Sequence, residues 1–166
     1  SAPGYQSVGS LEASFRFDQG SYLYDPYVGW GVWFADAGAP FDASAYLGVG
    51  YTYKGSAHRV REENFEITDY DYFVMDVPAS ADWKTVVVPY AQLHQEGWGG
   101  KSTFNPKNVG NVAFQVRGTS GAQGKVTIDN LMFLTRLPDQ PPDMTVMPAC
   151  PSGHTPLPSS RRAIGG

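Results

Sequence analysis

An all-β chain folded as an antiparallel two-sheet β-sandwich of the jelly-roll kind is predicted from three observations. Apolar and polar residues alternate over several short runs, the period-two pattern of strands with one buried face. Turn signals rich in glycine and proline separate these runs at short spacing. The chain also has 19 glycines, 10 tyrosines and 9 phenylalanines, and no helical period of useful length, which favours about eight strands.

The first two strands are predicted at residues 11–17 and 28–35, where apolar residues occupy alternate positions. In the second run Gly29, Gly31 and Trp33 share the face that points away from the core. Glycines inside a strand indicate close approach of another group to the backbone. We therefore expect a shallow trough along this strand, with Trp33 at its end.

A third strand is predicted at residues 46–54, and a charged, strand-like segment follows at residues 57–65. Such charge is typical of an edge strand or of a strand with one open face. The alternation leaves either His58 and Glu62 or Arg59 and Arg61 beside the open face, and the pattern does not decide between them. Four aromatic residues are assigned to the core from their position in the alternation: Trp30, Tyr51, Tyr53 and Trp83.

The stretch 70–89 contains two extended runs around a short polar turn. From Phe73 onward the odd-numbered residues are predicted to face the core. The even-numbered side carries Tyr70, Tyr72 and Asp76. Two tyrosines on this side predict a sheet whose aromatic face is left open to solvent or to a ligand.

The remaining elements are a loop at residues 97–100 with Trp98 at its tip, and strands at residues 109–117 and 125–134. Residues 1–137 are therefore predicted to form one domain. Residues 138–166 are rich in proline and are predicted to be a linker or tail to a neighbouring domain.

Composition excludes several classes of function. The net charge of −4 gives no basic surface for nucleic acid, and no apolar run is long enough to span a membrane. Cys150 is the only cysteine, so it cannot form an internal disulfide. We expect a monomer that binds neither nucleic acid nor membrane and requires no cofactor.

Three segments carry a family resemblance: Gly-Trp-Gly at residues 29–31, Trp-Lys-Thr-Val-Val-Val-Pro-Tyr at residues 83–90, and Gly-Lys-Val-Thr-Ile-Asp-Asn-Leu at residues 124–131. With the strand at residues 109–116, they resemble non-catalytic carbohydrate-binding modules with a β-jelly-roll fold, nearest to family eleven and its relatives. The resemblance implies binding of single β-glucan chains in an open aromatic cleft: mixed-linked β-1,3-1,4-glucan, soluble cellulose-type chains or xyloglucan. It also implies a secreted protein in which the module is covalently linked to a glycoside hydrolase domain.

A sugar ring has an apolar face and a rim of hydroxyls, so its site needs flat aromatic side chains and hydrogen-bonding groups. The resemblance adds Asp69 to the outward residues already described. The predicted carbohydrate-binding residues are Trp33, His58, Arg59, Arg61, Glu62, Asp69, Tyr70, Tyr72, Asp76, Trp98, Gln115 and Arg117.

Other interpretations stay open at this point. Asp129 is a candidate calcium ligand, or it caps a turn through the local backbone. A small jelly-roll glycoside hydrolase would need paired carboxylates, for which Glu62 with Glu63 and Asp69 with Asp71 are the candidates. Because Glu62 and Glu63 are adjacent in a strand, they are predicted to point to opposite faces. A third interpretation is a structural or protein-binding sandwich that uses the outward aromatic residues.

Overall fold

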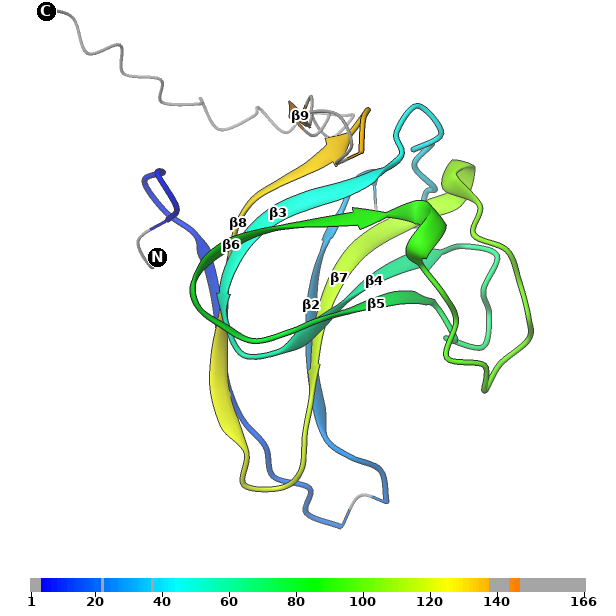
Figure 1. Ribbon diagram of the computed structural model, residues 1–166. Helices are drawn as coiled ribbons and strands as arrows, with labels where there is room; N and C mark the ends of the chain where they lie inside the picture. Colours follow the sequence, from blue (N-terminus) through cyan, green and yellow to red (C-terminus); the bar gives the residue numbers. More distant parts are fainter. Residues whose placement is uncertain (1–3, 22, 37, 138–143, 147–166) are drawn as a thin grey trace, which may run out of the picture.

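The computed structural model describes residues 4–21, 23–36, 38–137 and 144–146. Two antiparallel sheets lie face to face in this part of the chain (Figure 1). The first sheet has the order β1 (Leu11–Arg16), β8 (Gln123–Leu134), β3 (Gly48–Gly55) and β6 (Ser80–Pro89), with β9 (Met144–Val146) also paired to β8. The second has the order β2 (Tyr27–Trp33), β7 (Val109–Arg117), β4 (His58–Asn64) and β5 (Phe73–Val77). The predicted all-β sandwich is confirmed.

The core lies between the two sheets and is built from the inward half of each alternating strand. Val112, Phe114 and Val116 of β7 face Tyr51 and Tyr53 of β3, and all five side chains are buried. The Tyr51 ring meets the Phe114 ring edge to face, with 5.0 Å between centroids. Both tyrosines are therefore core residues, as their alternation predicts.

The buried tyrosine hydroxyls each have a partner. Tyr51 Oη lies 2.8 Å from Nε2 of His58, and Tyr53 donates to the backbone carbonyl of Pro78 over 2.7 Å. Burial of a hydroxyl is tolerated when it is hydrogen-bonded. The first bond joins β3 to the start of β4, and the second joins β3 to the turn between β5 and β6.

Trp83 was assigned to the core, and the structure shows this assignment to be wrong. Val86 pairs with Tyr51 across β6 and β3, so the even-numbered residues of β6 share the inward face and Trp83 points outward. Its ring is covered by Tyr5, 5.8 Å away between centroids, and by Lys54, whose Nζ lies 4.9 Å from the ring. Tyr5 of the N-terminal segment therefore covers this outward tryptophan with an apolar contact.

The strand β8 contains an irregularity at Asn130, whose φ of 53° lies in the left-handed region. The register between β3 and β8 shifts at this point. Inward residues therefore change from even positions such as Ile128 to odd positions such as Phe133. One extra residue at a bulge has this effect.

Most of the predicted linker, residues 138–166, lies outside the described residues, and so does Cys150. The three residues of it that are described form β9, whose Val146 pairs with Met132 of β8. In the described part of the chain, no helix combines the length and the apolar character needed to cross a membrane.

Candidate functional site

The outward side of the sheet β2-β7-β4-β5, called the open face below, carries a trough of small residues. The antiparallel register places Gly29 beside Gln115 and Gly31 beside Ala113. Tyr27 and Trp33 stand at the two ends of β2 on the same side. Because Trp33 lies six positions after Tyr27 along the strand, at about 3.3 Å per position, the trough between them is about 20 Å long.

Two hollows of the open face adjoin and share Tyr27, Arg61 and Gln115. One follows the trough and has a volume of about 280 Å³. The other, of about 510 Å³, lies between the loop that precedes β2 and the loop that carries Trp98. Together they form the groove, whose lining residues include Tyr24, Tyr27, Trp33, Arg61, Glu63, Tyr70, Trp98, Asn111, Gln115 and Arg117.

Aromatic side chains of the groove are more exposed than aromatic residues usually are. The exposed fractions are 47% for Trp33, 61% for Tyr27, 60% for Trp98 and 70% for Tyr70. Trp33 also has Phe65 beside it, 6.4 Å away between ring centroids. Neither Phe65 nor Tyr24 was among the predicted site residues, although each is an aromatic residue next to a predicted strand or loop of the site.

Tyr70 and Tyr72 are not sealed inside the sandwich. Tyr70 lies in the turn before β5 with a φ of 69°, and its ring meets that of Tyr72 edge to face at 6.2 Å. Tyr72 is half-buried, and its ring lies 5.2 Å from the Arg61 guanidinium. Loss of solvent raises the pKa of the Tyr72 hydroxyl. Tyr70 therefore lines the groove, and Tyr72 packs beside it between Tyr70 and Arg61.

The charged strand β4 contributes Arg59, Arg61 and Glu63 to the open face, which settles the alternation that the sequence left open. His58 and Glu62 are buried and point into the core instead, which contradicts their predicted place beside the open face. Glu62 has no exposed surface and neither of its carboxylate oxygens has a hydrogen-bond partner among the described residues. Burial raises the pKa of Glu62 and lowers that of His58.

Each arginine of the open face contacts a carboxylate. Glu96 accepts two hydrogen bonds from Arg117, of 2.8 and 2.7 Å, and lies 2.7 Å from Arg59. Hydrogen bonds from Arg117 and then from Arg59 lower the pKa of Glu96 to about 2. Asp76 completes this cluster with a contact of 2.9 Å to Arg59.

A second polar cluster lies along the trough. Arg61 pairs with Glu63, and Asn111 donates to the other oxygen of Glu63 over 2.7 Å. Gln115 accepts from Nε of Arg117 at 3.0 Å. Nε of Arg61 and Oδ1 of Asn111 are buried without a partner among the described residues, and unmet polar groups of this kind are uncommon in native proteins.

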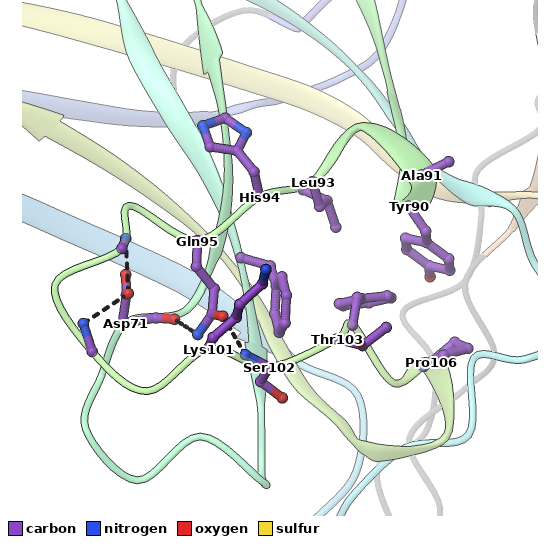
Figure 2. Close-up of a pocket in the computed structure, with 14 residues that line it drawn as sticks. Asp71, Tyr90, Ala91, Leu93, His94, Gln95, Lys101, Ser102, Thr103 and Pro106 are labelled. Carbon is purple, nitrogen blue, oxygen red and sulfur yellow. Dashed lines mark hydrogen bonds between the residues drawn. The ribbon is translucent and has the colours of Figure 1, made fainter.

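The loop that carries Trp98 is held by two aspartates from the turn before β5. Asp71 is 1% exposed, and its carboxylate accepts backbone N–H groups from Glu96, Gly97 and Gly99 at 2.9 to 3.0 Å. Figure 2 shows this carboxylate between two loop N–H groups, and the backbone carbonyl of Asp71 bonded to the side-chain amide of Gln95. Asp69 accepts from the N–H groups of Gly100 and Asp71, which lower its pKa. Asp69 thus bonds to the loop backbone.

The carboxylates considered for catalysis are buried or have hydrogen-bonding partners within the protein. Glu62 is buried on the core side of β4, whereas Glu63 lies on the open face, as the alternation predicts. Asp69 accepts the N–H of Gly100 and Asp71 accepts that of Gly99, so both bond to loop backbone. The carboxylates of the open face are instead paired with arginines.

Asp129 lies on the outer side of the first sheet, away from the groove. Its carboxylate accepts from the N–H of Tyr5 at 2.8 Å, the hydroxyl of Ser7 at 2.6 Å and the N–H of Asn130 at 2.7 Å. In the described ranges no three histidine, cysteine or acidic side chains gather as a metal site would require. Calcium at Asp129 stays a prediction, and the observed contacts are those of a turn cap.

Two kinds of comparison with known proteins are informative, whereas no family model matches the sequence. Over 135 residues the chain is 38% identical to Endoglucanase 3 of Fibrobacter succinogenes. The matched region covers 79% of this chain and 20% of that protein. The chain therefore spans about a fifth of this relative's length.

Solved structures reproduce the arrangement of the two sheets. A family 11 carbohydrate-binding module from Clostridium thermocellum, in complex with a β-1,3-1,4-mixed-linked tetrasaccharide, has a TM-score of 0.54 at 16% identity over 76% of this chain and 75% of its own. A family 30 module from a cellulosomal cellulase of Clostridium thermocellum has a TM-score of 0.54 at 15% identity over 77% and 75%. The fold is that of carbohydrate-binding modules. The resemblance to family eleven and its relatives is confirmed at this level.

Proposed function

We propose that the open face binds a single β-glucan chain and that the domain has no catalytic role of its own. The observation that carries this proposal is the trough of Gly29, Gly31 and Ala113 between the exposed rings of Tyr27 and Trp33. Small residues let a sugar chain approach the sheet closely, and the rings offer flat apolar surfaces for its C–H faces.

The polar groups of the groove suit the hydroxyl rim of such a chain. Arg61, Glu63, Asn111 and Gln115 line the trough, and together they include both donors and acceptors. If two or three rings and a few hydrogen bonds each contribute about 1 kcal/mol, the dissociation constant is roughly 10 to 100 μM. An affinity in this range suits a module that must release and rebind.

The attachment to a larger enzyme is part of the same proposal. A relative with the name of an endoglucanase matches this chain over one part of its length, and one solved structure with this fold holds a β-1,3-1,4-mixed-linked tetrasaccharide. Both support a secreted module that brings a linked glycoside hydrolase domain to plant polysaccharide, with mixed-linked β-glucan as the first candidate ligand.

Affinity electrophoresis on barley β-glucan, lichenan, xyloglucan and hydroxyethylcellulose tests the proposal. The wild-type protein is expected to be retarded on at least one of them, and Trp33→Ala is expected to lose the retardation. Trp83→Ala is the matched control, because its ring lies on the outer side of the other sheet. No retardation of the wild type on any glucan would end the proposal, and equal mobility of both variants would move the site elsewhere.

A further inference from the structure

The Trp98 loop, residues 95–100, borders a hollow through Gln95, Gly97 and Gly99. This hollow has a volume of about 740 Å³ and its lining includes Phe73, Tyr90, Leu93 and Phe104. In Figure 2 the labelled residues Tyr90 to Gln95 lie on one side of it and Lys101 to Pro106 on the other. The loop residues that line this hollow have no apolar side chain, so apolar packing on this side does little to fix the position of the loop.

Hydrogen bonds replace this missing packing. Asp71 receives three loop N–H groups, and such charge-assisted bonds are roughly twice as strong as neutral ones. The side-chain amide of Gln95 donates to the carbonyls of Asp71 and Gly100 and accepts the N–H of Ser102. These polar contacts hold the loop from below.

The glycines of the loop are required by this arrangement. Gly97 has a φ of 92°, which favours glycine. A Cβ on Gly99 would lie 2.6 Å from Cβ of Asp71 and from Oδ2 of Asp69. At Gly100 the nearest atom to an added Cβ is Oδ2 of Asp69 at 3.4 Å, an ordinary contact. The loop backbone can therefore approach Asp71 this closely because residues 97 and 99 are glycines.

This loop carries both Trp98 and Glu96. Trp98 lines the groove opposite Tyr24 and Tyr27, and Glu96 bonds to Arg59 and Arg117 on the sheet. We infer that Asp71 is the positioning residue of the groove: through the loop backbone it fixes Trp98 as the second wall against which the polysaccharide lies. This inference rests on the proposed function, because it assigns Trp98 to the same ligand.

A double-mutant cycle with Asp71→Asn and Trp98→Ala, read by isothermal titration calorimetry on barley β-glucan, tests the coupling. Each single variant is expected to weaken binding about tenfold. The double variant is expected to bind no more weakly than Trp98→Ala alone, because Asp71 acts through Trp98. Additive losses, or wild-type affinity in Asp71→Asn, would overturn the inference.

A second pair of variants leaves Asp71 itself unchanged. Gly99→Ala is expected to weaken binding like Asp71→Asn, whereas the neighbouring Gly100→Ala is expected to bind like the wild type. Equal affinity of these two variants would contradict the inference. Their melting temperatures report whether either substitution affects the whole fold.

Fluorine NMR of protein labelled with fluorotryptophan separates this inference from the proposed function, because it needs no ligand. In Asp71→Asn the Trp98 resonance, assigned with Trp98→Phe, is expected to shift or broaden while those of Trp30, Trp33 and Trp83 stay in place. An unchanged Trp98 resonance would overturn the inference even if glucan binds. A wild-type protein that binds no glucan would end the proposed function, and the claim that Asp71 positions a binding wall would end with it.

Discussion

Glu62 is a buried carboxyl whose effect on the fold depends on its protonation. Its side chain has no exposed surface and no hydrogen-bond partner for either oxygen among the described residues, and burial raises its pKa well above the ordinary value of 4.5. An ionised carboxylate in this place would be strongly unfavourable. Glu62 is therefore protonated in the folded protein at pH values where the unfolded chain has already ionised.

The sign of the resulting pH dependence follows from the raised pKa. Below about pH 4.5 Glu62 is protonated in both the folded and the unfolded protein, so its ionisation does not change the free energy of unfolding. Above this pH Glu62 ionises in the unfolded chain alone. The free energy of unfolding then falls by about 1.4 kcal/mol per pH unit until the pKa of Glu62 in the folded protein is reached. Glu62→Gln should therefore raise the melting temperature near pH 8 and change it much less near pH 4. Thermal unfolding of Glu62→Gln at both pH values measures this, with Glu63→Gln of the open face as control. An equal gain at both pH values would contradict the assignment of a neutral Glu62.

Some residue assignments could not be made from sequence. Both faces of β4 carry charge, because Glu62 is a buried acid, and buried acids are rare. The alternation alone therefore could not choose between Arg59 and Glu62. Asp71 lies 25 residues from Glu96, the first residue whose N–H it accepts, and no local pattern reports a hydrogen bond of that range.

At the scale of single elements, β2 is the strand whose sequence and role agree most closely. Its alternation predicts Trp30 packed against the core and Trp33 outside it, as observed. The outward residues of β7 were predictable for the same reason. Loop positions were less predictable from the sequence. Trp98 was expected at a loop tip, but whether it faces the groove depends on hydrogen bonds between segments far apart in the chain.

Filling the trough on β2 should abolish binding without changing the fold. A Cβ on Gly29 would have only the carbonyl oxygen of Phe114 within 4 Å, at 3.6 Å, so a side chain fits there, whereas one on Gly31 would lie 2.9 Å from a carbonyl oxygen. Gly29→Leu is therefore expected to lose retardation on every glucan that retards the wild type, with a melting temperature within a few degrees of it.

The control for this variant is Thr85→Leu, which places the same side chain on the outer side of the first sheet. It should be retarded like the wild type. If Gly29→Leu still bound with wild-type affinity, the sugar chain would not lie in the trough.

For the whole molecule, the architecture was predictable and the precise shape of the binding surface was not. Period-two patterns predicted the strands, and their number and turns predicted a sandwich. The second wall of the groove comes from a loop after β6, a strand of the opposite sheet. Contacts between elements far apart in the chain therefore complete the site.

Charge across the groove predicts how the intact protein responds to salt. Arg59, Arg61 and Arg117 each contact a carboxylate, so little uncompensated charge is left for a ligand. Affinity for a neutral glucan should change less than about twofold between low salt and about 0.5 M sodium chloride, since screening weakens only interactions between net charges. Titration calorimetry at both salt concentrations measures this. Retention on polygalacturonate at low salt would contradict it.

The anchoring of Tyr5 and Ser7 to Asp129 has a consequence for assembly. This segment lies against the first sheet, and β9 pairs with β8 of the same sheet. Both described segments therefore lie with the first sheet and not on the open face. Neither described segment covers the open face, so neither obstructs the approach of a long polymer to the groove.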